Sequence, residues 1–337
     1  MELQLKNIGM IKEASVKIDG LTVIAGENDT GKSTLSKALF FGLTIIKRVD
    51  SLNKSSMTIE DMQNILTCTK IFDVDILFGK NVEYLKDSQI DIIIDNQLIN
   101  VKLGFGVSQK EIIDKVKKIS SIPNSVFIET PIIWNLLDTF KSIAQIGQQM
   151  GIGVNHPYLM NDLAIKLSNS TIKKNKINIS DKVKRIIQGN FKKDDKGIFF
   201  FEKKKTRVEL INTATGIKYF GILQILSDNG WLAENNILIL DEPEVHLHPK
   251  WQLEMAKIIV ELVKNGVKIV VNSHSPYMIE ALKVYSENKG LKDKTNFYLA
   301  EKNEDTISSS IKDVTTDLEP IFIKLAEPYR KLELELE

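Results

Sequence analysis

Residues 21–34 read LTVIAGENDTGKST, and they carry the strongest structural signal in the chain. The first five residues are an apolar run typical of a buried strand. Residues 26–33 then match the pattern G-x-x-x-x-G-K-[ST] in full. The glycines let the backbone turn tightly, so that consecutive N–H groups point at phosphates, and the positive end of the following helix adds to the attraction. The stretch therefore predicts a nucleotide phosphate loop between a strand and a helix.

The side chains of this loop suggest the ligands. We expect Lys32 to bridge β- and γ-phosphate oxygens as a point charge, and Ser33 to place its hydroxyl on the Mg²⁺ that the phosphates carry. ATP and Mg²⁺ are thus the expected ligands. The other binding residues expected in the loop and the first helical turn are Gly26, Asn28, Asp29, Thr30, Gly31 and Thr34.

Composition sets broad limits on the protein. A chain of 337 residues with 43% apolar content can bury one large core or two modest ones, and its net charge of +1 favours no class of partner. Cys68 is the only cysteine, which excludes a disulfide framework and a cysteine-based metal site and fits a reducing cytoplasm. Residues 1–16 lack the apolar segment of a signal peptide, and the apolar stretch 35–46 is too short to span a membrane. We expect a cytoplasmic protein without a membrane partner.

The nucleotide-binding core is predicted to be discontinuous, built from residues 1–50 and 195–337. Alternating apolar residues in 2–7 and 14–18 predict two half-buried antiparallel strands ahead of the phosphate loop. Residues 296–301 and 306–311 look like terminal strands. A helix from Asp317 onward follows, with one side formed by Phe322, Leu325, Ala326 and Tyr329.

Residues 51–194 differ in character and predict a mainly helical insertion. Within it, the apolar runs 90–94 and 98–103 predict a hairpin, and residues 125–131 predict a strand that returns to the core sheet. Several lysine runs could contact a nucleic-acid backbone or form a solvated face, and both interpretations stay open. These runs are residues 173–176, 182–185, 192–193 and 203–205.

The second half of the site follows two more strands. Residues 236–242 read NILILDE, a strand buried on both faces that ends in two acids. Asp241, at the tip of a strand beside the phosphate-loop strand, is where Mg²⁺ needs a carboxylate, and Glu242 can orient and deprotonate the attacking water. The next strand ends at His274, which we expect to contact the γ-phosphate and report its presence. Lys32, Glu242 and His274 are the predicted catalytic residues.

Two further sets of residues attract attention. Helical spacing after Thr215 and Gly216 predicts that they lie at a helix N-terminus and form a second anion site. His246 and His248 could pair as metal ligands at i and i+2, or they could serve loop packing or a subunit contact, since no third ligand lies nearby in sequence.

Four motifs in this order resemble the ABC-type ATPase superfamily, and within it the compact, SMC-related RecF/OLD-like branch of bacterial DNA repair and antiphage defence. GENDTGKST is similar to the Walker A motif, ILILDEPEVHLHP to an extended Walker B, NSHSPY to the histidine switch, and TATGIK stands at the signature. The resemblance covers the first 50 residues and about residues 197–285. It implies an α/β P-loop fold with a mixed central sheet, an antiparallel N-terminal subdomain and a helical insertion.

Two features depart from the transporter members of this superfamily. TATGIK differs from LSGGQ, which puts a transport role in doubt. No convincing Q-loop is evident, although Glu129 and Thr130 occupy a plausible position for one.

The resemblance implies a head-to-tail homodimer, or a higher even oligomer, with ATP between the Walker A of one subunit and the signature of the other. The chemistry agrees with this arrangement. An anion site at Thr215 and Gly216 is redundant inside a monomer whose phosphate loop already holds the phosphates. It would complete the charge shell around a partner's γ-phosphate.

The function favoured by the sequence is an ATP-hydrolysing subunit whose dimer senses DNA or an invader and controls a separate effector, a nuclease, in bacterial defence. No long heptad segment is present, which argues against a coiled-coil chromosome ATPase. About sixty residues follow His274, too few for the Toprim nuclease of OLD proteins, so we expect the effector on another chain encoded nearby. A slowly hydrolysing oligomeric scaffold and a RecF-like DNA-repair ATPase are the alternatives.

Overall fold

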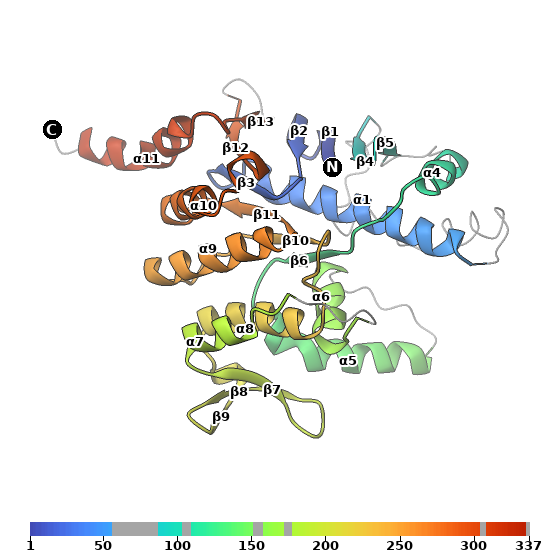
Figure 1. The fold of residues 1–337 in the computed structure, drawn as a ribbon, viewed down its shortest axis with the longest axis vertical. Coiled ribbons are helices and arrows are strands. Elements are labelled where there is room, and N and C mark those ends of the chain that lie inside the picture. Colours follow the sequence, from blue (N-terminus) through green and yellow to red (C-terminus); the bar gives the residue numbers. More distant parts are fainter. Residues whose placement is uncertain (56–86, 103–108, 151–157, 172–176, 304–307, 335–337) are drawn as a thin grey trace.

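A ten-stranded mixed sheet forms the centre of the computed structural model (Figure 1). The structure describes residues 1–55, 87–102, 109–150, 158–171, 177–303 and 308–334. The strands of the sheet are β1 (Glu2–Ile8), β2 (Ile11–Lys17), β3 (Leu21–Gly26), β4 (Gln89–Ile94), β5 (Gln97–Lys102), β6 (Ser125–Ile128), β10 (Ile237–Asp241), β11 (Lys268–Ser273), β12 (Thr295–Lys302) and β13 (Ser309–Asp313).

The spatial order is β5-β4-β1-β2-β13-β12-β3-β11-β10-β6. Strands β12, β3, β11, β10 and β6 run parallel to one another, whereas β4, β1 and β2 pair antiparallel. A separate three-stranded antiparallel sheet contains β7 (Asn190–Lys193), β8 (Phe199–Lys203) and β9 (Thr206–Glu209). The fold class is therefore the one predicted, an α/β P-loop fold with antiparallel N-terminal strands.

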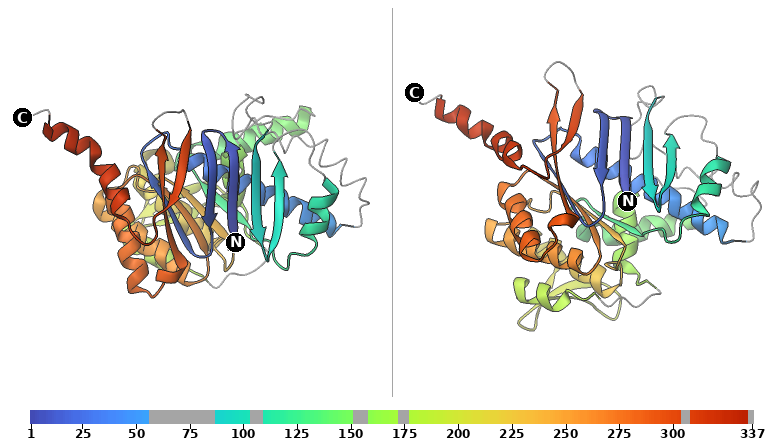
Figure 2. Two further views of the ribbon diagram at one scale, coloured as in Figure 1. Left: turned by 90° about the horizontal axis from the view of Figure 1, so that it is seen from above. Right: turned by 45° about the horizontal axis from the view of Figure 1, so that its top comes forward.

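Helices cover both faces of the large sheet (Figure 2). The long α1 (Lys32–Asn53) packs on one face, and α8 (Thr215–Asp228), α9 (Pro249–Lys264) and α10 (Pro276–Asn288) pack on the other. None of the helices in the described part of the chain is long and apolar enough to span a bilayer. The remaining helices are α4 (Gln109–Val116), α5 (Ile133–Met150), α6 (Tyr158–Ser168), α7 (Ser180–Ile187), α11 (Glu319–Leu334) and the short 3-10 turns η3 (Leu210–Asn212) and η4 (Lys292–Lys294).

Strand β3 shows why the central strands are continuously apolar. All six of its residues are buried. Val23 and Ala25 belong to the core under α8, α9 and α10, whereas Ile24 belongs to the core under α1, because successive side chains of a strand point to opposite faces. Each face of β3 is covered by helices, and its one polar side chain, Thr22, is buried with its Oγ1 donating to the Lys17 carbonyl oxygen at 2.7 Å.

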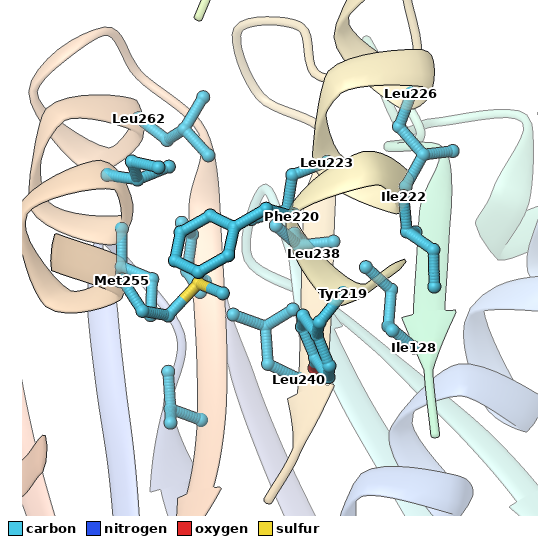
Figure 3. Close-up of a cluster of buried hydrophobic side chains, with 14 of the residues drawn as sticks. Ile128, Tyr219, Phe220, Ile222, Leu223, Leu226, Leu238, Leu240, Met255 and Leu262 are labelled. Atoms are coloured by element: carbon cyan, nitrogen blue, oxygen red, sulfur yellow. The ribbon is translucent and has the colours of Figure 1, made fainter. Parts of the chain in front are cut away.

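Helix α8 lies over the centre of the core that it shares with α9 and α10. Figure 3 shows Tyr219, Phe220 and Leu223 of α8 facing Leu238 and Leu240 of β10, with Met255 and Leu262 of α9 alongside. All of these side chains are at most 2% exposed. The packing fixes the start of α8 relative to the carboxyl end of β10, which is where the site lies.

The hairpin expected within residues 51–194 is present as β4 and β5, but it extends the large sheet. Strand β4 pairs with β1 in antiparallel register, Leu5 opposite Ile90 and Leu3 opposite Ile92. Ile92 then packs against Gly42 of α1, where an added Cβ would lie 2.5 Å from its Cδ1. Strand β6 also lies in this sheet, paired with β10.

The close approach of Gly221 to an aromatic ring yields a stability prediction. A Cβ at Gly221 would lie 2.4 Å from Cζ of Phe191, whose ring stacks on Trp134 at 5.3 Å. We expect Gly221→Ala to lower the free energy of unfolding by about 1–2 kcal/mol, since the clash outweighs the gain in helix propensity. Urea unfolding measures this. Ile165→Ala, at a half-exposed position, serves as the control and should change stability by at most about 0.5 kcal/mol.

Candidate nucleotide site

Three parallel strands bring their carboxyl ends to one edge of the sheet. Strand β10, which carries Asp241, does not lie beside β3 as predicted: β11 lies between the two, with Asn272 opposite both Ile24 and Asp241. Residues that directly follow β3, β10 and β11 in sequence therefore lie together, although more than two hundred residues separate the first from the others. The structure thus brings the phosphate loop, the two acids and His274 to the same edge.

The phosphate loop needs glycine at its two ends. Gly26 has φ 154° and Gly31 has φ 89°, values that side chains rarely adopt. A Cβ on Gly26 would lie 2.2 Å from the Ala300 carbonyl oxygen, and one on Gly31 would lie 2.8 Å from Cγ1 of Ile11. The loop is therefore held closely between β12 and the start of β2.

Lys32 is folded back into the loop. Its Nζ donates to the carbonyl oxygens of Gly26 at 2.9 Å and of Glu27 at 2.6 Å, and the residue is only 4% exposed. Burial lowers the pKa of Lys32, while the nearby Glu242 and Asp241 carboxylates oppose that shift. The two hydrogen bonds thus hold the Lys32 amino group inside the loop, where a phosphate would lie.

The other loop residues differ in their surroundings. Thr30 is buried and its Oγ1 donates to the Glu27 carbonyl oxygen at 2.8 Å, which closes the loop. Asn28 and Asp29 lie exposed at the tip, where Asp29 pairs with Lys302 at 2.7 Å. Thr34 lies in the first turn of α1, near Gly9.

Asp241 is the acid that joins the three strands. Its Oδ1 accepts hydrogen bonds from Ser33 Oγ at 3.0 Å and from Asn272 Nδ2 at 2.7 Å. Ser36 in turn donates to the Asn272 amide oxygen at 2.9 Å. Burial raises the pKa of Asp241, and the two hydrogen bonds oppose that rise. A buried carboxylate beside a serine hydroxyl is an oxygen ligand set that fits Mg²⁺.

Glu242 sits in a strained turn that aims its side chain at His274. Its φ is 48°, an uncommon value for a residue with a side chain, and its N–H donates to the Asn272 carbonyl oxygen at 3.0 Å. His274 Nδ1 lies 3.3 Å from Glu242 Oε1 without hydrogen-bond alignment. The contact with His274 lowers the pKa of Glu242, and the contact with Glu242 raises the pKa of His274, so the two charges favour each other.

The sequence did not single out Glu244, which lies beneath this pair. Its Oε1 accepts from Ser273 Oγ at 2.7 Å and from the His274 backbone N–H at 2.8 Å. Its Oε2 is buried without a hydrogen bond to any described residue, as is the Tyr219 hydroxyl from α8. Burial raises the pKa of both Glu244 and Tyr219. The acid three positions after Asp241 was visible in sequence, but only the fold shows that it holds the His274 backbone.

Helix α8 begins at Thr215, as predicted, and no side chain caps its first turn. Gly216 lies against the segment that follows the acids, where a Cβ would be 3.0 Å from Cδ2 of Leu247. His248 accepts the Lys250 N–H at 3.3 Å through Nδ1 and so caps α9. Residues in the described ranges form no group of three His, Cys, Asp or Glu suited to a metal, which leaves His246 and His248 without a third ligand there.

Glu129 lies directly after β6, at the edge of the sheet next to β10. It forms an ion pair of 2.9 Å with Lys37 on the phosphate-loop helix. The pair links the outer parallel strand to α1. Glu129 therefore lies near the site, at the position considered for a Q-loop.

The strand order, the phosphate loop and the acids at the strand tips place the chain in the α/β P-loop class. Residues 160–279 match the family model "AAA ATPase domain", about a third of the chain, and they include Thr215, Asp241, Glu242 and His274 but not the phosphate loop.

One curated relative is the Septu protein PtuA of Bacillus thuringiensis. It is 36% identical over 45 residues, which are 13% of this chain and 11% of the relative. The alignment thus spans about a tenth of the relative's length.

Solved structures similar to the chain include SMC head domains. An SMC head bound to the C-terminal winged-helix domain of ScpA covers 95% of this chain and 98% of its own, with a TM-score of 0.49 at 15% identity. The SMC head domain from Thermotoga maritima covers 93% and 98%, with a TM-score of 0.43 at 14% identity. An SMC head with an extended coiled coil, bound to the C-terminal domain of ScpA derived from Pyrococcus furiosus, covers 98% and 98%, with a TM-score of 0.46 at 14% identity.

The Glu242–His274 contact predicts a pH dependence of stability. Because the folded state raises the pKa of His274, protonated His274 stabilises the fold below its unfolded pKa of about 6.5, and this contribution is lost as pH rises through the folded pKa. His274 is 40% exposed, so solvent screening holds the effect to at most about 1 kcal/mol. The stability lost in His274→Gln should therefore be larger at pH 6 than at pH 8 in urea unfolding. In a Glu242→Gln background that difference should shrink, and an equal difference would contradict the assigned contact.

Proposed function

We propose that this chain binds Mg²⁺ and ATP at the phosphate loop and hydrolyses the ATP within a two-fold dimer. The observation that carries the proposal is the hydrogen bond between Ser33 and Asp241, which places a hydroxyl and a buried carboxylate side by side at the foot of a phosphate loop. Mg²⁺ bound there would neutralise charge on the β- and γ-phosphates. Lys32 would exchange its bonds to loop carbonyls for bonds to phosphate oxygens.

Glu242 is the proposed general base for the attacking water. Its contact with His274 lowers the pKa of Glu242, so the carboxylate is ionised at neutral pH and able to accept a proton. His274 is proposed to contact the γ-phosphate through the ring, while Glu244 holds its backbone N–H. Loss of the γ-phosphate would then be transmitted to Glu242 through the His274 side chain.

The uncapped start of α8 supports the dimer. The first-turn N–H groups have no side-chain acceptor, and Thr215 is partly exposed beside them. Because a helix N-terminus attracts anions, a partner's γ-phosphate is a suitable acceptor for these groups. ATP would then hold the two subunits together, and hydrolysis would release them.

For the biological role we propose control of a separate effector in bacterial defence. The short similarity to PtuA, which is named a Septu protein, supports this reading over a housekeeping role. A nuclease encoded nearby is the favoured effector, and DNA is a candidate trigger. Three lysines of the basic runs are paired with acids, Lys182 with Glu261, Lys184 with Asp181 and Lys192 with Glu202, so part of that positive charge is already neutralised. The neighbouring genes and a nuclease assay with their products test this role.

A slowly hydrolysing scaffold is the second candidate function. The strained turn at Glu242 favours the active switch over it, because strain of this kind persists where it serves a mechanism. Stimulation of turnover by DNA or by the effector separates the two, since a scaffold should show none.

The general-base role predicts the behaviour of Glu242→Gln. Glutamine keeps the shape but cannot accept the proton, so turnover should fall by about 10²- to 10⁴-fold. ATP binding should persist and the ATP-bound dimer should accumulate, as measured by phosphate release and by light scattering after gel filtration. Glu254→Gln, at a partly exposed position on α9 that pairs with Lys257, serves as the control. Unchanged turnover in Glu242→Gln would remove the assigned role.

A mixing experiment tests the shared site directly. Lys32→Ala should lose tight ATP binding, and Thr215→Glu should bind ATP but repel a partner's γ-phosphate, so each variant alone should be inactive. A Glu in the first helical turn favours folding, which keeps that variant intact. A mixture should regain about a quarter to a half of wild-type turnover, because one of the two composite sites is then complete.

A control variant and one outcome of the mixture complete the test. The control is Thr215→Gln, which adds bulk without charge and should retain more activity than Thr215→Glu. A mixture that stays as inactive as its components, although both variants are folded by circular dichroism, would show that the sites are not shared between subunits.

A further inference from the structure

An apolar groove lies between α9 and α10, beside the start of α11. Its volume is about 500 Å³, and its lining includes Leu253, Tyr277, Glu280, Val284, Tyr285 and Phe322. Tyr277 is 61% exposed, Val284 39% and Leu253 37%, which is unusual for large apolar side chains that share one surface. The groove therefore has the character of a docking surface.

Helix α11 carries an apolar stripe that continues beyond the body of the protein. Phe322 and Leu325 pack against the core, and Tyr329 and Leu332 extend the same stripe at helical spacing. Tyr329 is 66% exposed and Leu332 53% exposed. Figures 1 and 2 show α11 leaving the body, with the C-terminus at its far end. The outer half of this helix, residues 326–334, is called the arm below.

The arm is poorly suited to stand alone as a helix. Pro328 lies inside α11, where it removes a backbone hydrogen bond and crowds the preceding turn. Helices shorter than about 12 residues are marginal in water unless an apolar face is packed. The arm therefore needs a surface that covers Tyr329 and Leu332.

Charge favours a match between the arm and the groove. Glu280 is the charged residue among those that line the groove, and it is exposed. Arg330 follows Tyr329 on the arm, and neither Glu280 nor Arg330 has an ion pair to another described residue. An arm seated with Tyr329 in the groove would bring these opposite charges to the rim.

We propose that two copies of this chain exchange their arms, each placing Tyr329 and Leu332 in the partner's groove between α9 and α10. Because Phe322 lines the groove and also begins the stripe, a two-fold axis would set the two α11 helices antiparallel, with each Phe322 near the other copy's Tyr329. The surface is isologous, so the contact closes at two subunits. It uses α9, α10 and α11 and needs no nucleotide, so the proposed ATP-dependent contact would join these pairs into a higher even oligomer.

The first test is the molar mass of the nucleotide-free protein by sedimentation equilibrium at micromolar concentrations. Wild type should be dimeric, and the double variant Tyr329→Glu/Leu332→Glu should raise the dimer dissociation constant by about 100-fold, as expected when two central anchors are lost. Ile165→Glu, at a 52% exposed position on α6, is the matched control and should remain dimeric. A monomeric wild type, or a dimer unaffected by the double variant, overturns the proposal.

The second test examines the seating of the arm. Glu280→Arg and Arg330→Glu should each weaken the dimer by about three- to tenfold, and the combined charge reversal should restore it. Both positions are exposed, so folding should be unaffected. A combined variant as dissociated as the single ones overturns this seating.

Mixing Val284→Glu with the arm variant should give a weak heterodimer, since one intact arm then meets one intact groove. No heterodimer at all contradicts the exchange.

Discussion

The site depends on one carboxylate oxygen that accepts two hydrogen bonds. Oδ1 of Asp241 receives Ser33 from the phosphate-loop helix and Asn272 from the neighbouring strand, and thereby fixes three strand tips relative to one another. Ser36, one turn along α1, holds the far side of Asn272. The positions of Glu242 and His274 depend on this arrangement, because Glu242 follows Asp241 directly and His274 follows Asn272 by two residues. Removal of Asp241 would therefore change the geometry of the site as well as its charge.

Burial opposes the charged forms of three groups around this point. Burial raises the pKa of both Asp241 and Glu244 and lowers the pKa of Lys32, which means that the surrounding protein alone does not fully support any of the three charges. A metal-bound triphosphate would supply a positive charge to the acids and negative oxygens to the lysine. Under the proposed function, binding of such a ligand would relieve these unfavourable charges and would so couple nucleotide to assembly.

Much of the site could be read from sequence because its residues directly follow buried strands. An apolar run that ends in an acid or a histidine fixes both the strand and the place of the side chain, as for Asp241 and His274. Glu244 and Tyr219 escaped this reasoning, since Glu244 contacts the end of β11, Tyr219 lies on α8 packed across β10, and no local pattern records either contact. The pairing of β4 with β1 was missed for the same reason: a hairpin's own pattern does not say which edge it joins. The stripe on α11 was visible in sequence, but only the structure shows that Tyr329 lies outside the core.

The position of β3 has a consequence for how the protein is made. This strand, complete by residue 26, lies between β11 and β12, which begin at residues 268 and 295. A ribosome therefore exposes an apolar strand long before either of its neighbours has been synthesised, and the central sheet cannot close until β12 has emerged. Pairing between strands so far apart in sequence slows folding and leaves β3 open to aggregation in the meantime.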